Sequence, residues 1–140
     1  IKSLLDMYFR CCLDAVKTIK DYDVFCHFDF AFKTAYAVDN TIKIYEYEDY
    51  LIQLFKIIIE DGKVLEINTK VQEIINDVDH IKYFLRLYKS LGGTDISLSS
   101  DAHKLDRYMS SFDRIIPIIK ECGFNELCYF VHRKKYKISI

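Results

Sequence analysis

Short apolar segments alternate along the chain with longer segments of helical periodicity, and this alternation restricts the fold more than any other feature. The apolar segments span Val24–Cys26, Val64–Ile67, Asp95–Ser99 and Leu127–Val131, and each has the length of one buried strand. Strands that alternate with helices over mostly short connections form parallel sheets with helices packed on them. We therefore predict an α/β fold with a parallel sheet.

Four segments have apolar residues at helical spacing and lie before and between these strands. They span Ser3–Lys20, Glu46–Asp61, Asp79–Leu91 and Asp106–Cys122. Glycine follows each of the last three, as is common at helix ends. Pro117 lies inside the fourth segment, where it should kink the helix or mark a new start. The segment from Phe30 to Thr41 has no clear period, and we predict a long connection there.

The composition fits one domain of ordinary size and argues against several functions. The chain has 140 residues, 51% of them apolar, and a formal net charge of −1. This charge gives no electrostatic footprint for nucleic acid. The basic run Arg133–Lys135 is interpreted as a solvated chain end rather than an anion site. The densest apolar stretch, Leu51–Ile59, is too short for a membrane span and is interrupted by Gln53 and Lys56.

The cysteines indicate a reducing environment. They are five in number and scattered, without a C-x-x-C pair, at Cys11, Cys12, Cys26, Cys122 and Cys128. Such cysteines are typical of reduced, mostly buried thiols of an intracellular protein, and we expect a cytoplasmic location without a signal peptide. Because the first residue is Ile1 rather than Met, we expect that further residues preceded it.

Polar residues follow the carboxyl end of every predicted strand. They are His27 and Asp29, Glu66 and Asn68, Asp101 and His103, and His132 and Arg133. The carboxyl ends of parallel strands meet at one edge of a sheet, where α/β proteins carry their sites. We predict that these residues share a site at this edge, although loops are polar in any case.

The sequence Ser99-Ser100-Asp101-Ala102-His103 holds the strongest candidates for metal ligands. Two residues apart on an extended backbone, Asp101 and His103 point to the same side and can reach one divalent cation. The alternative is a capping Asp101 and a surface His103. His27, at the end of an apolar strand, is the third candidate, and a buried structural histidine is its alternative. Three such ligands hold an ion and leave a position for water.

The remaining polar residues have several roles open to them. Glu66 suits a metal ligand, a general acid or base, or a structural carboxylate. Asn68 suits a hydrogen bond to a substrate or to its own loop, and Asp29 suits orienting the nearby histidine or capping the connection. We expect neither His80, on the polar side of a helix start, nor His132, near the chain end, to bind metal.

A phosphate ester is the substrate that suits such a site. Hard divalent cations neutralise charge on phosphoryl oxygens and acidify the attacking water. The sequence has no glycine-rich phosphate loop, serine hydrolase motif or dinucleotide fingerprint that would favour another chemistry.

Five segments carry a resemblance to a known family. They are Asp23–Asp29 (DVFCHFD), Leu65–Thr69 (LEINT), Leu91–Gly93 (LGG), Ser99–Lys104 (SSDAHK) and Cys122–Phe124 (CGF). In this order and spacing, they resemble the carboxyl-terminal half of the histidinol-phosphate phosphatases of the PHP (polymerase and histidinol phosphatase) family. The resemblance extends over essentially the whole chain, and its S-D-A-H, H-x-D and E-I-N motifs are fairly specific in combination.

The resemblance implies a fold, a reaction and a set of ligands. Residues 1–140 would form a single partial domain, the carboxyl-terminal part of a distorted (β/α)7 barrel with Mn, Fe or Zn at the carboxyl ends of its strands. The reaction would be hydrolysis of L-histidinol phosphate to L-histidinol and phosphate in histidine biosynthesis. By position, His27, Asp101 and His103 would bind metal, Asp101 and His103 also acting in catalysis. Glu66 and Asn68 would lie in the substrate pocket.

The chain also departs from the family pattern. No histidine precedes His27, so the family's amino-terminal H-x-H motif has no counterpart, and about half of a barrel of ~250 residues is absent. Cys26 stands where glycine is usual. Phe32 stands where a basic residue is common, and Lys33 beside it is a substitute for binding substrate.

Because of these departures, we expect the chain alone to be weakly active or inactive. An open barrel edge would need a partner, either the missing amino-terminal half or a second copy. Two alternatives stay open: a PHP phosphoesterase with another substrate, and a non-catalytic half-barrel that serves as an assembly module.

Overall fold

A three-stranded parallel sheet lies at the centre of the computed structural model, which describes all 140 residues. Its strands, in the order β1-β2-β3, are Val24–Phe25, Val64–Asn68 and Ile96–Ser99. Leu65 of β2 pairs with both neighbours, opposite Phe25 and Ile96. All five residues of β2 are buried, as expected of a central strand covered on both faces. The predicted α/β fold with a parallel sheet is confirmed for these three strands.

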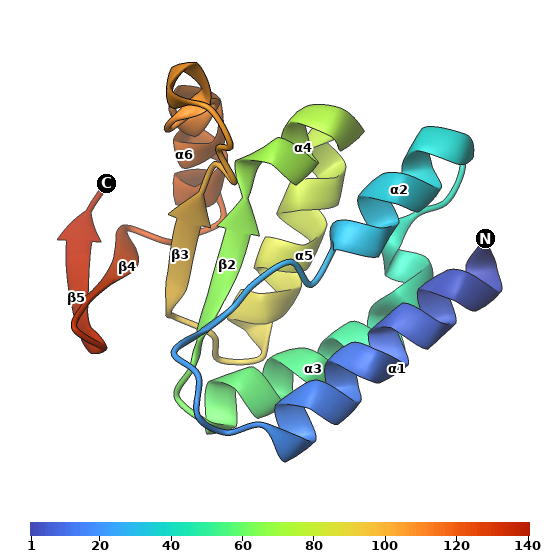
Figure 1. Cartoon of the computed structure of the whole chain (residues 1–140), viewed down its shortest axis with the longest axis horizontal. Helices are drawn as coiled ribbons and strands as arrows, with labels where there is room; N and C mark the ends of the chain where they lie inside the picture. The colour runs from blue at the N-terminus through green and yellow to red at the C-terminus, as the bar shows by residue number, and fades with distance from the viewer.

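Helices precede and follow the strands of this sheet (Figure 1). They are α1 (Lys2–Thr18), α2 (Phe30–Val38), α3 (Glu48–Glu60), α4 (Thr69–Ile75), α5 (Val78–Ser90) and α6 (Phe112–Glu121), with 3₁₀ turns η1 (Ile44–Tyr47) and η2 (Leu105–Arg107). The helices α1 and α3 lie side by side. The buried ring of Phe28 packs edge-on against Phe55 of α3 and Phe84 of α5, with centroids 5.5 and 5.1 Å away. None of the helices combines the length and the apolar character that a membrane crossing requires.

Two helices stand where the sequence indicates connections. The prediction of a long connection over Phe30–Thr41 is wrong, because α2 occupies most of it. Phe32 and Ala35 are the buried residues of α2, and apolar residues at its two ends are exposed, so its sequence shows no apolar stripe. The short α4 follows β2 directly, and Asn68 caps it by accepting hydrogen bonds from the N–H groups of Lys70 and Val71.

The last helix begins later than predicted. It starts at Phe112 rather than Asp106, because the preceding residues form η2 and then bend through Met109 and Ser111, with φ of 57° and 61°. The helix continues through Pro117 to its end. The residues between Ser99 and Phe112 therefore form a loop at the carboxyl end of β3.

The last predicted strand does not join the parallel sheet. It is β4 (Glu126–Val131), which pairs antiparallel with β5 (Lys134–Ser139) in a separate two-stranded sheet. The turn between them, His132 and Arg133, has φ of 48° and 64°, as a type I′ hairpin requires. The prediction of a fourth parallel strand is therefore wrong, because a local hairpin satisfies the hydrogen bonds of β4. The basic run Arg133–Lys135 belongs to this hairpin rather than to a free chain end.

Ion pairs tie the β4–β5 hairpin to the amino-terminal ends of the parallel strands. Arg133 lies 3.0 Å from Asp23, just before β1, and Lys137 lies 2.8 Å from Asp95, just before β3. His132 and Arg133 therefore lie near the end of the sheet opposite to its carboxyl edge. This pair of polar residues does not join the predicted site.

Candidate functional site

Five of the residues selected from the sequence lie at the carboxyl edge of the parallel sheet. His27 comes two residues after β1, Glu66 and Asn68 end β2, and Asp101 and His103 follow β3. Figure 1 shows β2 and β3 pointing to the same edge, with α4 beside it. Parallel pairing therefore brings together residues that are far apart in the sequence.

The backbone of His27 is held in an unusual conformation by two neighbours. Its φ is 60°, in the left-handed region that few residues other than glycine adopt. Its N–H donates to Glu66 Oε2 at 2.9 Å, and its carbonyl accepts a hydrogen bond from the hydroxyl of Tyr8 in α1. The ring Nδ1 lies 3.3 Å from Asn68 Nδ2 and 4.0 Å from Glu66 Oε2. Because these contacts involve Nδ1, the other ring nitrogen, Nε2, is the one left to bind an ion or a substrate.

Asp101 and His103 form a pair of candidate metal ligands beside His27. Asp101 also has a left-handed backbone, with φ of 46°. Its Oδ1 lies 3.3 Å from His103 Nε2, and its Oδ2 accepts a hydrogen bond from Lys70 Nζ at 3.3 Å. Burial raises the pKa of Asp101, but the hydrogen bonds from Lys70 and His103 outweigh it, so its pKa is lowered and the carboxylate is charged at neutral pH.

The spacing of this pair fits a shared cation. Two ligands at about 2.1 Å from one zinc ion, at a tetrahedral angle, lie about 3.4 Å from each other. The 3.3 Å between Asp101 Oδ1 and His103 Nε2 agrees with this value. No group of three or more His, Cys, Asp and Glu side chains converges closely enough to hold an ion. The chain therefore supplies two candidate metal ligands that lie side by side, and His27 is a third candidate on the same edge.

A polar pocket of about 310 Å³ opens beside Asp101 and His103. Its lining contains no apolar residue, and Lys70, Lys104 and Arg107 bring positive charge to it. Lysine ammonium and arginine guanidinium groups beside the Asp101–His103 pair suit an anionic ligand such as phosphate. These cations are not among the polar residues that directly follow the strands. The sequence signal for Lys70 is its place in the first turn of the next helix, two residues after Asn68.

Glu73 of α4 holds the loop that carries part of this pocket. Its carboxylate accepts hydrogen bonds from the hydroxyls of Ser110 and Ser111, at 2.9 and 2.6 Å, and it forms an ion pair with Arg107. Burial raises the pKa of Glu73, but these hydrogen bonds and the ion pair outweigh it, so its pKa is lowered. An anionic Glu73 thus joins α4, at the end of β2, to the loop after β3.

Lys33 lies on the His27 side of this edge. Its Nζ is 4.1 Å from the centre of the Phe30 ring, in a cation–π contact. The Phe30 ring in turn packs edge-on against the ring of His27, with centroids 5.8 Å apart. The structure records no contact between Lys33 and the Asp101–His103 pair.

Asp29 and His80 are buried behind the edge and contact each other. Asp29 accepts a hydrogen bond from Gln72 Nε2 at 2.8 Å, and its Oδ2 lies 4.0 Å from His80 Nε2. The expectation that His80 lies on a polar helix face is wrong, because its side chain is 4% exposed and packs on Phe32 with centroids 4.8 Å apart. The Asp29 carboxylate points into this cluster rather than toward the ring of His27.

A larger apolar groove adjoins the other side of Asp101. Its volume is about 700 Å³, and nine of its twelve lining residues are hydrophobic. It runs between the end of β3, the loop that follows, and the β4–β5 hairpin, and includes Leu98, Met109, Phe112, Leu127 and Ile138. A polar pocket and an apolar groove therefore meet at the same carboxylate.

Comparisons with known proteins find similarity to histidinol phosphatases. No family model matches the chain. The histidinol-phosphatase of Lactococcus lactis is 32% identical over 135 residues, which are 95% of this chain and 50% of the relative. The probable histidinol-phosphatase of Clostridium acetobutylicum is 25% identical over 135 residues, 96% of this chain and 53% of the relative.

A solved structure agrees with these relatives. The crystal structure of histidinol phosphate phosphatase from Lactococcus lactis, complexed with zinc, L-histidinol and phosphate, superposes on 94% of this chain and 50% of that chain, with a TM-score of 0.82 and 29% identity. The chain spans about half the length of the curated relatives that it matches.

Proposed function

Because the chain is a homologue of the histidinol phosphatases over 95% of its length, we propose that it is part of a metal-dependent phosphomonoesterase that hydrolyses L-histidinol phosphate to L-histidinol and phosphate. It would represent the carboxyl-terminal half of a PHP-type (β/α)7 barrel, acting in the cytoplasm in histidine biosynthesis. The observation that carries the proposal is the Asp101–His103 pair, 3.3 Å apart, beside a pocket with three cationic side chains.

Asp101, His103 and His27 are the residues of this chain that would hold divalent metal. A cation there would neutralise charge on a phosphoryl oxygen and lower the pKa of the attacking water. The zinc in the Lactococcus lactis structure supports a divalent cation, and Mn or Fe are further candidates for the same nitrogen and oxygen donors. The donor set would be completed by residues outside these 140, since fewer than three donors converge here.

The other polar residues would bind and orient the substrate. Lys70, Lys104 and Arg107 would bind phosphoryl oxygens, because their charges line the pocket beside the donors. Glu66 would keep His27 in its left-handed conformation through the hydrogen bond at 2.9 Å from its backbone N–H. Asn68 and Lys33 would contribute to the substrate pocket from either side of His27.

The rest of the barrel would cover the apolar groove. In the parallel sheet, β1 and β3 are edge strands, and β4 pairs with β5 alone. Unpaired edges and a groove of about 700 Å³ with mostly hydrophobic lining need a partner. The relatives are about twice as long as this chain, which supports the missing amino-terminal half as that partner. Cover over this groove would also shield the Asp101 side of the site from water.

Phosphate release tests the proposed reaction. The encoded protein, at its natural length, is incubated with Zn²⁺ or Mn²⁺ and with L-histidinol phosphate, a nucleoside monophosphate or a sugar phosphate. We expect L-histidinol phosphate to be hydrolysed fastest. The variants His27→Ala and Asp101→Asn should lose about 100-fold or more in kcat/KM and retain less metal, whereas His132→Ala, in the hairpin turn, should behave as the wild type. Faster hydrolysis of another ester would assign a different substrate.

One observation favours a second candidate, a non-catalytic assembly module. It is the absence of three converging metal donors in this chain. Metal analysis separates the two functions. A phosphatase retains bound metal that His27→Ala and Asp101→Asn remove, whereas a module binds no stoichiometric metal and keeps its stability in both variants.

A further inference from the structure

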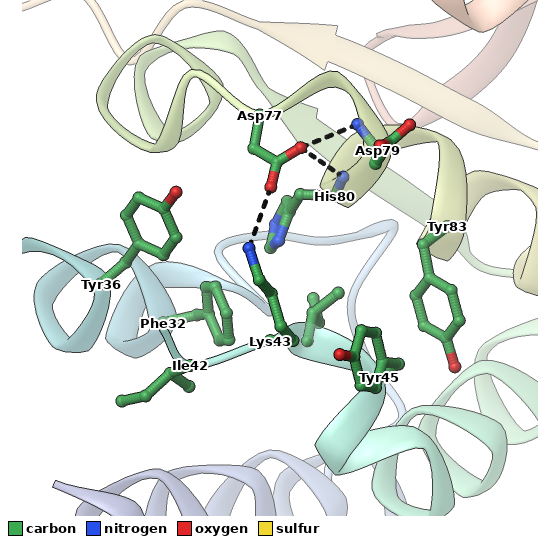
Figure 2. Close-up of a pocket in the computed structure, with 10 residues that line it drawn as sticks. Phe32, Tyr36, Ile42, Lys43, Tyr45, Asp77, Asp79, His80 and Tyr83 are labelled. Atoms are coloured by element: carbon green, nitrogen blue, oxygen red, sulfur yellow. Dashed lines mark hydrogen bonds and ion pairs between the residues drawn. The ribbon is translucent and has the colours of Figure 1, made fainter. Parts of the chain in front are cut away.

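A third cavity lies between α2, the segment that leads into η1, and the start of α5 (Figure 2). Its volume is about 250 Å³, enough for a molecule with one ring, since a cavity of about 150 Å³ already holds benzene. Phe32 and Tyr36 of α2, Tyr45 of η1 and Tyr83 of α5 contribute aromatic rings to its wall. It contains none of the residues of the strand-edge site.

The charged groups around this cavity favour a cation. Two carboxylates, Asp77 and Asp79, line it, and Lys43 is its single cationic residue. Lys43 Nζ lies 3.5 Å from Asp77 Oδ2 and 6.0 Å from the centre of the Tyr36 ring, as Figure 2 shows for the ion pair. The ammonium group of Lys43 therefore lies between a carboxylate and an aromatic ring. Asp79 leaves the cavity with one negative charge in excess, and this charge would repel an anionic ligand.

His80 contributes a buried ring to the wall of the cavity. Its side chain is 4% exposed, and its Nε2 has no hydrogen-bond partner. The ring reaches from α5 toward Phe32 and Lys43 in Figure 2, and the His80 residue lines the cavity. The Nε2 atom is inaccessible to solvent and lies 4.0 Å from Oδ2 of the buried Asp29, which is not part of the cavity wall. A ligand in the cavity would therefore contact the ring of His80 and not this nitrogen.

From these contacts we propose that the cavity binds a small aromatic amine that is positively charged at neutral pH. Its ring would pack among the aromatic side chains and the ring of His80, and its ammonium would bind Asp77 and Asp79. Aromatic rings and carboxylates attract such a cation together. This proposal is independent of the phosphatase function, because the two sites share no residue.

Two probes that differ in charge test the proposal on the encoded protein at its natural length. Tyramine and 3-(4-hydroxyphenyl)propionate carry the same phenol ring on chains of similar length, ending in an ammonium and a carboxylate respectively. We expect tyramine to bind with a dissociation constant of about 1 mM or below and the anion at least about tenfold more weakly. In NMR spectra, tyramine should shift the ring signals of His80 and leave those of His132 unchanged. Equal binding of both probes, or shifts confined to His27 and His103, would overturn the proposal.

Variants of residues that line the cavity test whether tyramine binds there. Asp77 caps α5 through hydrogen bonds from the N–H groups of Asp79 and His80, and asparagine caps a helix equally well. The double variant Asp77→Asn, Asp79→Asn should therefore fold normally and bind tyramine at least about tenfold more weakly. Tyr45→Leu, at a side chain that is 59% exposed, should also weaken binding. Asp113→Asn, which removes a first-turn carboxylate from α6, is the control. Unchanged affinity in the double variant contradicts the proposed site.

Discussion

At the scale of single residues, His27 and Asp101 share a backbone feature that links their position to their proposed role. Both have positive φ at the carboxyl edge of the sheet, and both are candidate ligands. A non-glycine residue in this region carries strain of about 1–3 kcal/mol, which surrounding contacts must offset. Glu66 and Tyr8 provide such contacts to the backbone of His27.

Removing the hydroxyl of Tyr8 tests this support. The variant Tyr8→Phe leaves the partly buried carbonyl of His27 without its donor, and we expect the free energy of unfolding to fall by about 1 kcal/mol. Urea denaturation measures this change. Tyr129→Phe, at a side chain that is 47% exposed, is the control and should change stability little. A Tyr8→Phe variant as stable as the wild type would show that the hydroxyl does not support this backbone.

Gly93 is required by a close approach rather than by its backbone angle. A Cβ atom at this position would overlap the ring of Tyr88, which is buried and hydrogen-bonded through its hydroxyl to the carbonyl of Asp95 at 3.1 Å. We expect Gly93→Ala to lower the free energy of unfolding by about 1–3 kcal/mol, because a packed ring must move. The neighbouring Thr94→Ala, at an exposed position, should change thermal stability by less than about 0.5 kcal/mol. Equal melting temperatures for the two variants would contradict this reading.

At the scale of elements, the sequence predicts the strands and helices that depend on short-range apolar patterns. The strands before His27 and Asp101 were evident from apolar runs, and the polar residues after them followed from the same pattern. The sequence gives no sign of helix α2, because its two buried residues make no apolar stripe. It also gives no sign that His80 is buried, because Phe32, which covers it, is 48 residues away. The pairing of β4 with β5 depends on the left-handed turn at His132 and Arg133, residue types without a strong turn preference.

The docking of the β4–β5 hairpin should depend on pH through Asp95. Burial raises the pKa of Asp95, but hydrogen bonds from Lys135 and Lys137 outweigh it and lower the pKa. A carboxyl whose pKa is lower in the folded state stabilises the fold above its unfolded pKa of about 4, and this contribution is lost as the pH falls through the folded pKa.

Comparing Asp95→Asn with the wild type from pH 3 to pH 8 measures this contribution. Between about pH 5 and 8 the variant should be less stable by up to about 1 kcal/mol, and the difference should shrink below about pH 4. Asp14→Asn, at an exposed carboxylate of α1 without an ion pair, should show no such window. A constant difference at all pH values would mean that Asp95 acts through packing rather than charge.

At the scale of the whole molecule, the site lies at a boundary of the chain's own structure. The polar pocket is lined by Lys70 of α4 and by the loop after β3, and the apolar groove lies on the other side of Asp101. The resemblance to the PHP family predicts an incomplete barrel, because the family's H-x-H motif has no counterpart here, and the chain spans about half the length of the curated relatives that it matches. The sequence does not indicate where the apolar groove lies. Leu127 and Met109 line it together only once the hairpin and the loop have folded.

The open groove should make the 140-residue chain self-associate when it is produced alone, because water-exposed apolar surface and strand edges favour pairing. Met109 and Ile138 lie in the groove and are 52% and 57% exposed. The double variant Met109→Asp, Ile138→Asp should weaken self-association at least about tenfold without unfolding the chain, as measured by analytical ultracentrifugation and circular dichroism. Leu105→Asp changes a residue that is 92% exposed and outside the groove, so it should associate as the wild type does. If all three proteins are monomers at high concentration, the groove is not a surface that requires cover.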